Sequence, residues 1–177
     1  MGAQKLEIKK SAVPAGSLAS KYLPANYSDA FCCEFTTEKE VNANELSTCF
    51  WTHQPEWIRM LFKLRNILVK PFGLQTSNEE NNDQTIINVL EAGATTSLAS
   101  LSDKSDTETV LCLNDKHLKA YAAIYVENNE VHKRVTLSTI VHFHNLLGYV
   151  YFYAICPFHM LVVKSSLKHS IRSLYFS

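Results

Sequence analysis

The spacing of hydrophobic and polar positions changes near Thr85, from intervals typical of a helix to intervals typical of strands. Upstream of that point, apolar residues recur at i, i+4, i+7 and i+11, counted from Trp57. Thr52 can cap a helix that begins here, and Pro55 stands where proline is favoured, in the first turn. The spacing therefore predicts a helix over residues 53–70.

From residue 85 onward the hydrophobic positions alternate, as they do in strands with one buried face. The alternation predicts five strands, over residues 85–92, 95–102, 108–113, 117–126 and 131–144. The last three are expected to form an antiparallel meander. Its tight turns are predicted at Asn114-Asp115 and Asn128-Asn129, because Asn and Asp tolerate the positive φ that hairpins need.

Three shorter segments complete this pattern. Ser17 can open a short helix that stops before Pro24, and residues 30–38 have the composition of a strand. The segment QTSNEENNDQ, residues 75–84, is polar and acidic and has nothing to bury. We expect it to be a flexible loop.

The strand predicted over residues 117–126 has two unlike faces. Its apolar face carries Leu118, Ala120, Ala122, Ile124 and Val126. The other face carries His117, Lys119, Tyr121 and Tyr125. We expect the first face to pack on the core and the second to be wetter.

The run HNLLGYVYFYAICPFHMLVVK, residues 144–164, is almost unbroken in its hydrophobicity. Asn145 can cap a long helix that starts there, and Pro157 should kink it. At about 100° per residue, one stripe of this helix stays apolar throughout. That stripe, expected to face the core, consists of Tyr149, Tyr153, Cys156, Met160, Val163, Leu167, Ile171 and Leu174. The opposite side is apolar in the first half only, so the first half is expected to be buried on two sides.

Three arrangements would bury that first half. A membrane span is one, since residues 146–163 approach the lower limit of roughly 17–25 residues for crossing a bilayer. A subunit interface, in the simplest case a homodimer, is the second. The third is a helix across a curved sheet, with one side packed and the other closing a cavity. We favour the third and expect no membrane span, because His159, Pro157 and the amphipathic continuation of the helix suit a protein core.

Length and composition narrow the class of protein. The 177 residues suit a single domain over 1–177, and the equal numbers of basic and acidic residues, 17 each, disfavour nucleic acid as a partner. The five cysteines are odd in number and lack CxxC spacing, so no zinc or disulfide framework is expected. No phosphate-binding glycine loop is present, so no cofactor is expected. The opening MGAQKLEIKKSAVPAG holds no apolar stretch of secretory-signal length, so we expect a cytoplasmic protein.

Histidines and cysteines are the first candidates for chemistry. His142 and His144 are two apart on a predicted strand and could chelate a metal, with His159 as a third ligand. Their face also holds several polar residues, so a solvated strand face is the better interpretation and no metal is expected. A nucleophilic Cys156 would need a neighbouring base that the sequence does not place, and a small buried hydrophobe is preferred.

Arg65 is a stronger candidate. On the helix predicted over residues 53–70 it projects toward the apolar side, where a guanidinium must find an acceptor or reach out to solvent. A structural ion pair with a carboxylate such as Asp115 or Glu127 is the preferred interpretation. An anchor for the acidic head group of a ligand is the alternative.

The chain resembles an uncharacterised bacterial family, domain of unknown function 2867. The resemblance rests on blocks in the same order and with compatible spacing: LPANYSDAF, LRNILVKPFGL, LNDKHLKAYAAIYV and VTLSTIVHFHNLLGYVYFYAICPFHMLVVKSSL. It covers residues 23–167 and departs at 88–109, where the strand region is longer and richer in Ser and Thr. The family supplies no activity or catalytic residue to transfer.

The order of elements is also similar to that of the helix-grip superfamily, which includes START-like and birch-pollen-allergen-like proteins. That resemblance implies an α+β domain in which a curved antiparallel sheet packs against a long C-terminal helix, with a second helix near residues 53–70. It also implies an apolar or amphiphilic small molecule bound between sheet and helix. We expect the ligand to be lined by Arg65, Tyr121, Tyr125, Tyr153 and His159. A structural or protein-interaction domain, dimerising through the C-terminal helix, is the alternative function, and an enzyme is the third.

Overall fold

The computed structural model describes residues 5–58, 60, 82–96 and 99–176. Its strands are β1 (Ile8–Ser11), β2 (Tyr27–Thr36), β3 (Ala99–Lys104), β4 (Glu108–Asn114), β5 (Leu118–Asn129) and β6 (His132–Phe143). Its helices are the 3-10 helix η1 (Leu18–Tyr22) and the α-helices α1 (Ala43–Thr52), α3 (Asn82–Ala92) and α4 (Leu146–Tyr175). The six strands form one antiparallel sheet in the order β1-β2-β6-β5-β4-β3. The predicted α+β class, with a long C-terminal helix on an antiparallel sheet, is confirmed.

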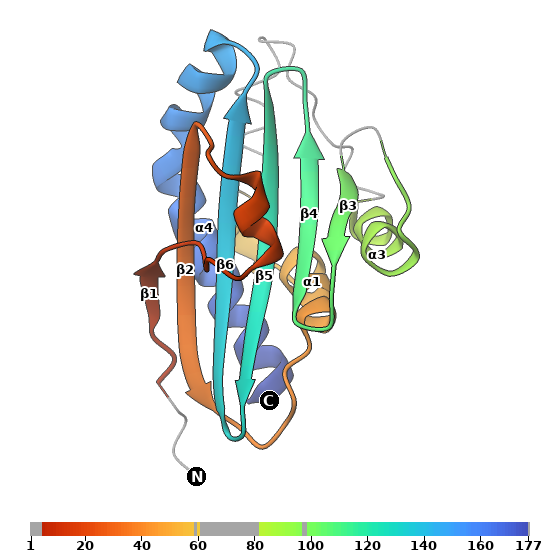
Figure 1. The fold of residues 1–177 in the computed structure, drawn as a ribbon, viewed down its shortest axis with the longest axis vertical. Helices are drawn as coiled ribbons and strands as arrows, with labels where there is room; N and C mark the ends of the chain where they lie inside the picture. Colours follow the sequence, from red (N-terminus) through yellow and green to blue (C-terminus); the bar gives the residue numbers. More distant parts are fainter. Residues whose placement is uncertain (1–4, 59, 61–81, 97–98, 177) are drawn as a thin grey trace.

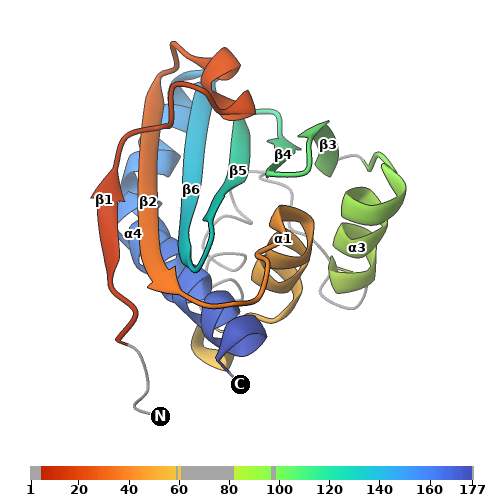
Figure 2. The same cartoon turned by 60° about the horizontal axis from the view of Figure 1, so that its bottom comes forward.

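Two layers cover the sheet, one on each face. Figure 1 shows α4 and α1 behind the sheet and the segment with η1 in front of it, and Figure 2 shows the same separation from another side. The face toward α4 carries the largest group of buried apolar side chains, to which Phe31, Leu137 and Leu167 belong. These three residues come from β2, β6 and α4, so the main core joins the two ends of the chain.

The meander predicted at the C-terminal end of the sheet is confirmed. Strands β5 and β6 pair without a shift from Leu118↔Phe143 to Asn129↔His132. The second turn lies two residues later than predicted, since Glu130 has the positive φ of 50°. Asn128 instead holds the backbone of Val41, donating to its carbonyl at 2.9 Å and accepting from its N–H at 3.2 Å.

The second face of the sheet is not solvated, contrary to the prediction for the strand face that carries His142. Thr136 and Ser138 on this face are buried, because the segment with η1 lies across β5 and β6 (Figure 1). Buried Glu108 holds that segment, since its carboxylate accepts hydrogen bonds from the N–H groups of Leu18 and Ala19. Burial raises the pKa of Glu108, and the two backbone donors partly offset this rise.

Residues 85–92 form part of α3, so the strand predicted there is wrong. Ile86, Val89 and Leu90 lie at i, i+3 and i+4, and all three are buried against β3 and β4. In so short a segment the alternating and helical patterns overlap, and packing on the sheet edge selects the helix.

The predicted helix over residues 53–70 falls mostly outside the described residues. Thr52 does not cap it: α1 ends at Thr52, whose hydroxyl donates to the carbonyl of Thr48 at 2.7 Å. A new helical segment covers residues 56–58. Helix α1 was not predicted, although Asn42 caps it by accepting from two backbone N–H groups. The predicted loop 75–84 lies outside the described residues as far as residue 81, and α3 begins at Asn82.

Helix α4 begins after Asn145 as predicted, but its first half buries a different side of the helix from the one predicted. Tyr149 and Tyr153, expected in the core, are exposed, whereas Gly148 and Phe152 are buried. Gly148 is the reason, because an added Cβ there would lie 2.1 Å from the carbonyl oxygen of His117. Only glycine lets the helix approach the β4–β5 turn so closely. The second half follows the prediction, with Val163, Leu167 and Ile171 buried.

Candidate functional site

Four polar side chains meet between the sheet and α4, and we call them the Asp29 cluster: Tyr27, Asp29, Cys156 and His159. Tyr27 and Asp29 are two apart on β2, so both point to the face that α4 covers. Cys156 and His159 are three apart on α4 and therefore share one side of the helix. The cluster joins segments about 130 residues apart in the sequence.

The carboxylate of Asp29 is the centre of this cluster. Its Oδ2 accepts a hydrogen bond from the Tyr27 hydroxyl at 2.7 Å and lies 3.5 Å from Nε2 of His159, an ion-pair distance. The thiol of Cys156 donates to the Tyr27 hydroxyl at 3.5 Å. The second oxygen, Oδ1, is buried and has no hydrogen-bond partner among the described residues. An acceptor of this kind retains the capacity to bind a hydroxyl or ammonium donor.

The surroundings of Asp29 are aromatic and largely dry. The ring of Phe152 lies 4.7 Å from that of Tyr27 and 5.9 Å from that of His159, measured between centroids. Burial, with the nearby carboxylate of Asp29, raises the pKa of Tyr27, so this hydroxyl stays a neutral donor at physiological pH. The side chain of Asp29 is 3% exposed, whereas that of His159 is 20% exposed. Solvent therefore reaches the cluster from the side of His159.

The chemistry available to these groups is hydrogen bonding and proton exchange. A carboxylate that contacts an imidazole orients the ring. The described part of the chain holds no group of three or more His, Cys, Asp or Glu side chains placed to ligate one ion. His142 instead lies on the opposite face, with Nε2 3.1 Å from the carbonyl oxygen of Tyr22.

The residues predicted to line a ligand are divided between the two faces of the sheet. Tyr153 and His159 are on α4, where the rings of Tyr153 and Tyr27 are 6.2 Å apart. Tyr121 is on the face that η1 covers and stacks on Tyr22 at 3.7 Å. Tyr125 shares the face of Tyr121, since it lies four residues further along β5. Arg65 lies outside the described residues.

Sequence reasoning missed Tyr27 and Asp29, the two members of the cluster on β2. A signal was available in the segment LPANYSDAF, residues 23–31, where Tyr and Asp alternate at the start of a strand. Alternation puts both side chains on one face, and an acidic residue on a face otherwise destined for the core needs a partner. The identity of that partner, His159, could not be read from the spacing.

Away from the Asp29 cluster, a hollow lies along α1, beside the C-terminal ends of α3 and α4. It has a volume of about 510 Å³ and is lined largely by polar residues, including Asn42, Asn44, Glu45, Thr48, His53 and Glu91. Its wall carries the carboxylates of Glu45 and Glu91 and few apolar side chains, whereas pockets for apolar ligands are lined mainly by hydrophobic and aromatic residues. This hollow therefore does not suit the apolar molecule that the helix-grip resemblance implies.

The cysteines are buried without exception, and we expect them to be unreactive in the folded protein. Burial raises the pKa of Cys33 to about 11, and that of Cys49 is raised for the same reason. Titration with dithionitrobenzoate at mildly alkaline pH should therefore modify the thiols slowly in the native protein and rapidly in concentrated guanidinium. Fast native modification mapped to Cys156 would contradict this prediction and favour a thiol nucleophile.

Comparison with known proteins gives a family and no activity. A family model described as a protein of unknown function, DUF2867, matches residues 22–166. No curated protein and no solved structure matches the chain. Both halves of the Asp29 cluster, on β2 and on α4, lie within the matched residues.

Proposed function

The chain belongs to the DUF2867 family of proteins of unknown function, and from that premise we propose that it binds a small amphiphilic molecule at the Asp29 cluster. The observation that carries the proposal is the buried Oδ1 of Asp29, which has no partner among the described residues. A buried carboxylate oxygen without a donor is costly, and a hydroxyl or ammonium group of a ligand would remove that cost.

The surroundings of the cluster favour a ligand with an apolar body. Phe143, Phe152 and Tyr153 form a group of aromatic rings above the start of β2, with centroids 5.5 to 6.1 Å apart. Such rings contact hydrocarbon well, while the carboxylate sets the position of one polar group. Access would be through the partly exposed side of His159.

The arrangement of elements supports the proposed relation to the helix-grip superfamily. The first long strand, β2, pairs with the last, β6, the helices α1 and α3 precede the meander, and α4 lies on one face. This is the order on which the resemblance rests, and in that superfamily the ligand lies between sheet and last helix. We also propose a cytoplasmic location, which the five unpaired cysteines favour.

A matched pair of fluorescent probes tests the proposal. Dansylcadaverine and dansyl-aminohexanoate share the same apolar body and chain and differ in ending with an ammonium or a carboxylate. We expect the ammonium probe to bind more tightly, and Asp29→Asn to weaken its binding by at least about tenfold, because a charge-assisted hydrogen bond is lost. Fluorescence titration measures both affinities.

Glu34→Gln is the control for this experiment. Glu34 lies on the same strand, is exposed and forms a 3.8 Å ion pair with Arg134. It should leave probe binding unchanged. Equal binding of the two probes, or equal affinities of Asp29→Asn and the parent chain for the ammonium probe, would rule out a ligand at the Asp29 cluster.

A further inference from the structure

The first half of α4 presents large apolar side chains to solvent. We call them the α4 apolar face: Leu146, Tyr149, Val150, Tyr153, Phe158 and Leu161. Each is between 44% and 77% exposed. In the most hydrophobic 18-residue window of this helix, only 22% is buried inside the protein. A continuous apolar surface of this kind marks an interaction site.

The buried side of α4 decides how such a helix can meet a partner. Phe152 and Cys156 pack on β6 and β5, and Val163 belongs to the main core. Crossing a membrane would strip these residues from the sheet, although the helix is long and apolar enough to span one. A helix that stays attached by one side can offer its other side to a surface, lying in the plane of that surface.

The distribution of charged residues along the chain indicates which kind of surface the α4 apolar face would suit. All 17 acidic residues of the chain precede Val131, and the last 47 residues contain five Lys or Arg and no Asp or Glu. Residues 131–177 thus carry a formal charge of +5, and residues 1–130, with the remaining 12 basic residues, carry −5. The part of the chain that contains the α4 apolar face therefore has a net positive charge, although residues 135–163 themselves hold no Lys, Arg, Asp or Glu.

Lysines border the α4 apolar face at both ends. Lys164 follows Leu161 by three residues, and its Nζ lies 4.8 Å from the ring of Phe31. Lys10 pairs with Phe31 across β1 and β2, so both side chains point to the α4 side of the sheet. At the other end, the carbonyl of Lys116 accepts from the side chain of Asn145, the cap of α4.

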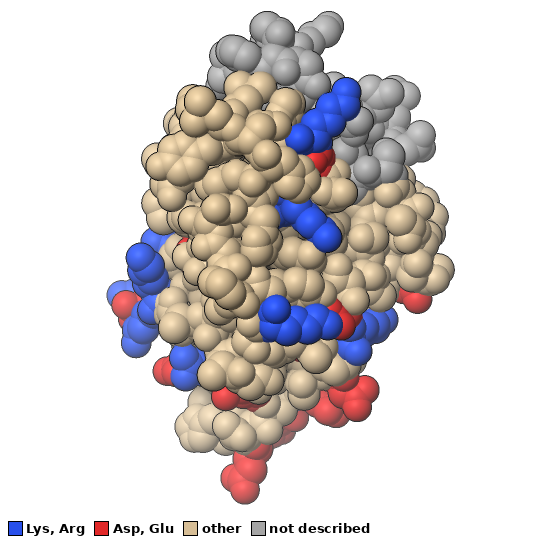
Figure 3. All heavy atoms as spheres, turned by 45° about the horizontal axis from the view of Figure 1, so that its top comes forward, with Lys and Arg blue, Asp and Glu red and all other residues tan. Residues whose placement is uncertain are grey.

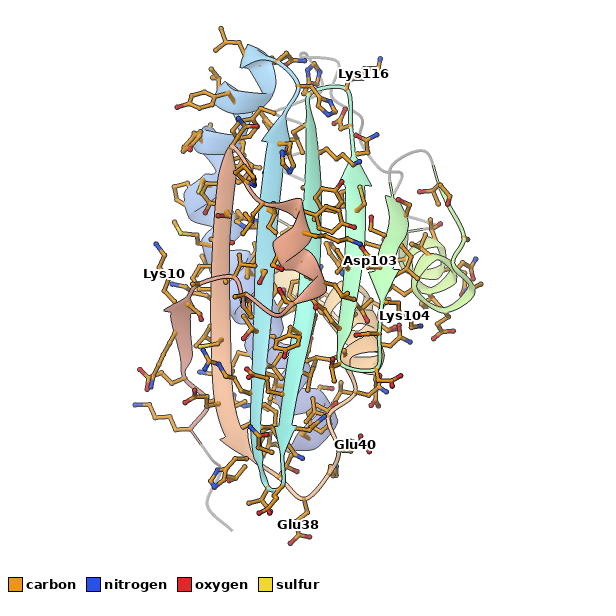
Figure 4. All side chains as sticks on the ribbon, in the orientation of Figure 1. Lys10, Glu38, Glu40, Asp103, Lys104 and Lys116 are labelled. Atoms are coloured by element: carbon orange, nitrogen blue, oxygen red, sulfur yellow. The ribbon has the colours of Figure 1, made fainter. Side chains whose placement is uncertain are left out.

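The figures show how these charges are distributed in space. Figure 4 shows Lys116 at the end where α4 begins and Lys10 on the strand beside α4, whereas Glu38 and Glu40 lie at the opposite end. Figure 3 shows the end of the molecule where α4 begins, together with the face that η1 covers; uncharged atoms cover most of this view, and acidic side chains gather mainly along its lower edge. Asp115 is next to Lys116 in the chain, and its side chain accepts from the Lys116 N–H.

We propose that the α4 apolar face docks on an anionic membrane surface. Its aliphatic residues would enter the boundary between head groups and acyl chains, and Tyr149 and Tyr153 suit the head-group level. Lys10, Lys116 and Lys164 would contact the anionic head groups, and each lysine near such a surface strengthens binding. A neutral apolar partner, such as a second copy of this chain, would make no use of these flanking lysines.

Vesicle flotation tests this proposal. The full chain is mixed with vesicles of phosphatidylcholine alone, or of phosphatidylcholine with about a quarter phosphatidylglycerol, and the protein that floats is measured. We expect binding to the anionic vesicles, weakened by salt, and little binding to the neutral ones. Val150→Glu should reduce binding by at least about tenfold, since it places a charge in the apolar boundary.

Val131→Glu is the matched control. Val131 is likewise an exposed valine, at the tip of the β5–β6 hairpin, far from the start of α4 in Figure 1. The Val131→Glu variant should bind anionic vesicles as the parent chain does. The combined Lys116→Gln and Lys164→Gln substitutions should abolish the preference for anionic over neutral vesicles. Melting temperatures of all variants establish that they are folded.

Three results would overturn the proposal. One is equal binding by Val150→Glu and Val131→Glu, and another is a parent chain that does not float with anionic vesicles. The third is a dimer that forms in the absence of vesicles and is dissociated by Val150→Glu, seen by sedimentation velocity, which would assign the face to a second copy. Asp29→Asn should float like the parent, so failure of the ligand proposal would leave this one standing.

Discussion

Leu167→Ala is expected to lower the free energy of unfolding by about 2–5 kcal/mol, the range typical of a large aliphatic residue removed from a packed core. Leu167 is fully buried on α4, in the cluster that also holds Phe31 and Leu137. Alanine would leave a cavity between the helix and both central strands. Equilibrium unfolding in guanidinium, followed by circular dichroism, measures the change.

The same substitution at Leu161 is the control, because Leu161 lies on the same helix but is exposed. Leu161→Ala should change the free energy of unfolding by no more than about 0.5 kcal/mol. Similar losses for the two variants would mean that α4 does not pack on the sheet through the side that carries Leu167.

Gly148→Ala should destabilise the protein by about 1–3 kcal/mol, although alanine is normally favoured over glycine inside a helix. The new Cβ would lie 2.1 Å from the carbonyl oxygen of His117, and backbone atoms cannot move aside as a flexible side chain can. The start of α4 would have to lift away from the β4–β5 turn. Thermal unfolding and hydrogen exchange of residues near His117 measure this effect.

Gly16→Ala is the comparison, since a Cβ at Gly16 would meet nothing within 4 Å. It should leave the melting temperature nearly unchanged. A Gly148→Ala variant as stable as Gly16→Ala would contradict the proposed reason for the orientation of the first half of α4.

Much of the sheet and of α4 could be predicted because the signals are local. The alternation along β5 and β6 persists for twelve residues in each strand, which is long enough to exclude a helical spacing. Asn145 marks the start of α4, and its side chain accepts from the N–H of Gly148 at 3.0 Å. Caps and long periodic runs depend on neighbours in the sequence and therefore survive without tertiary information.

The errors arose where local signals were short or balanced. Residues 85–92 fit a helix and a strand about equally, and the edge of the sheet provided the apolar surface that favoured α3. Tyr149 and Tyr153 were placed in the core because they continue the apolar stripe that runs along the whole helix at about 100° per residue. Gly148 has no side chain to reveal that its own side of the helix makes the closest contact.

In the candidate site too, local patterns identified some residues, whereas tertiary contacts determined their partners. His159 and Tyr153 were selected from the helix that carries them, and His159 does contact a buried carboxylate. Tyr121 was selected for its face of β5, and it stacks on Tyr22 of a segment with no strong pattern of its own. No periodicity in the chain predicts that this segment covers the second face of the sheet.

The sequence by itself determined the α+β class, the meander of β4 to β6, the long C-terminal helix and the uneven distribution of charge along the chain. Each of these features follows from composition or from the spacing of residues that are near one another in the sequence. Such local patterns are already present before the chain folds into a compact state. Only the tertiary structure decided which side of α4 is buried, which face of the sheet η1 covers, and that Asp29 meets His159. These depend on close contacts between segments up to about 130 residues apart, whose geometry is set by packing and not by any local pattern.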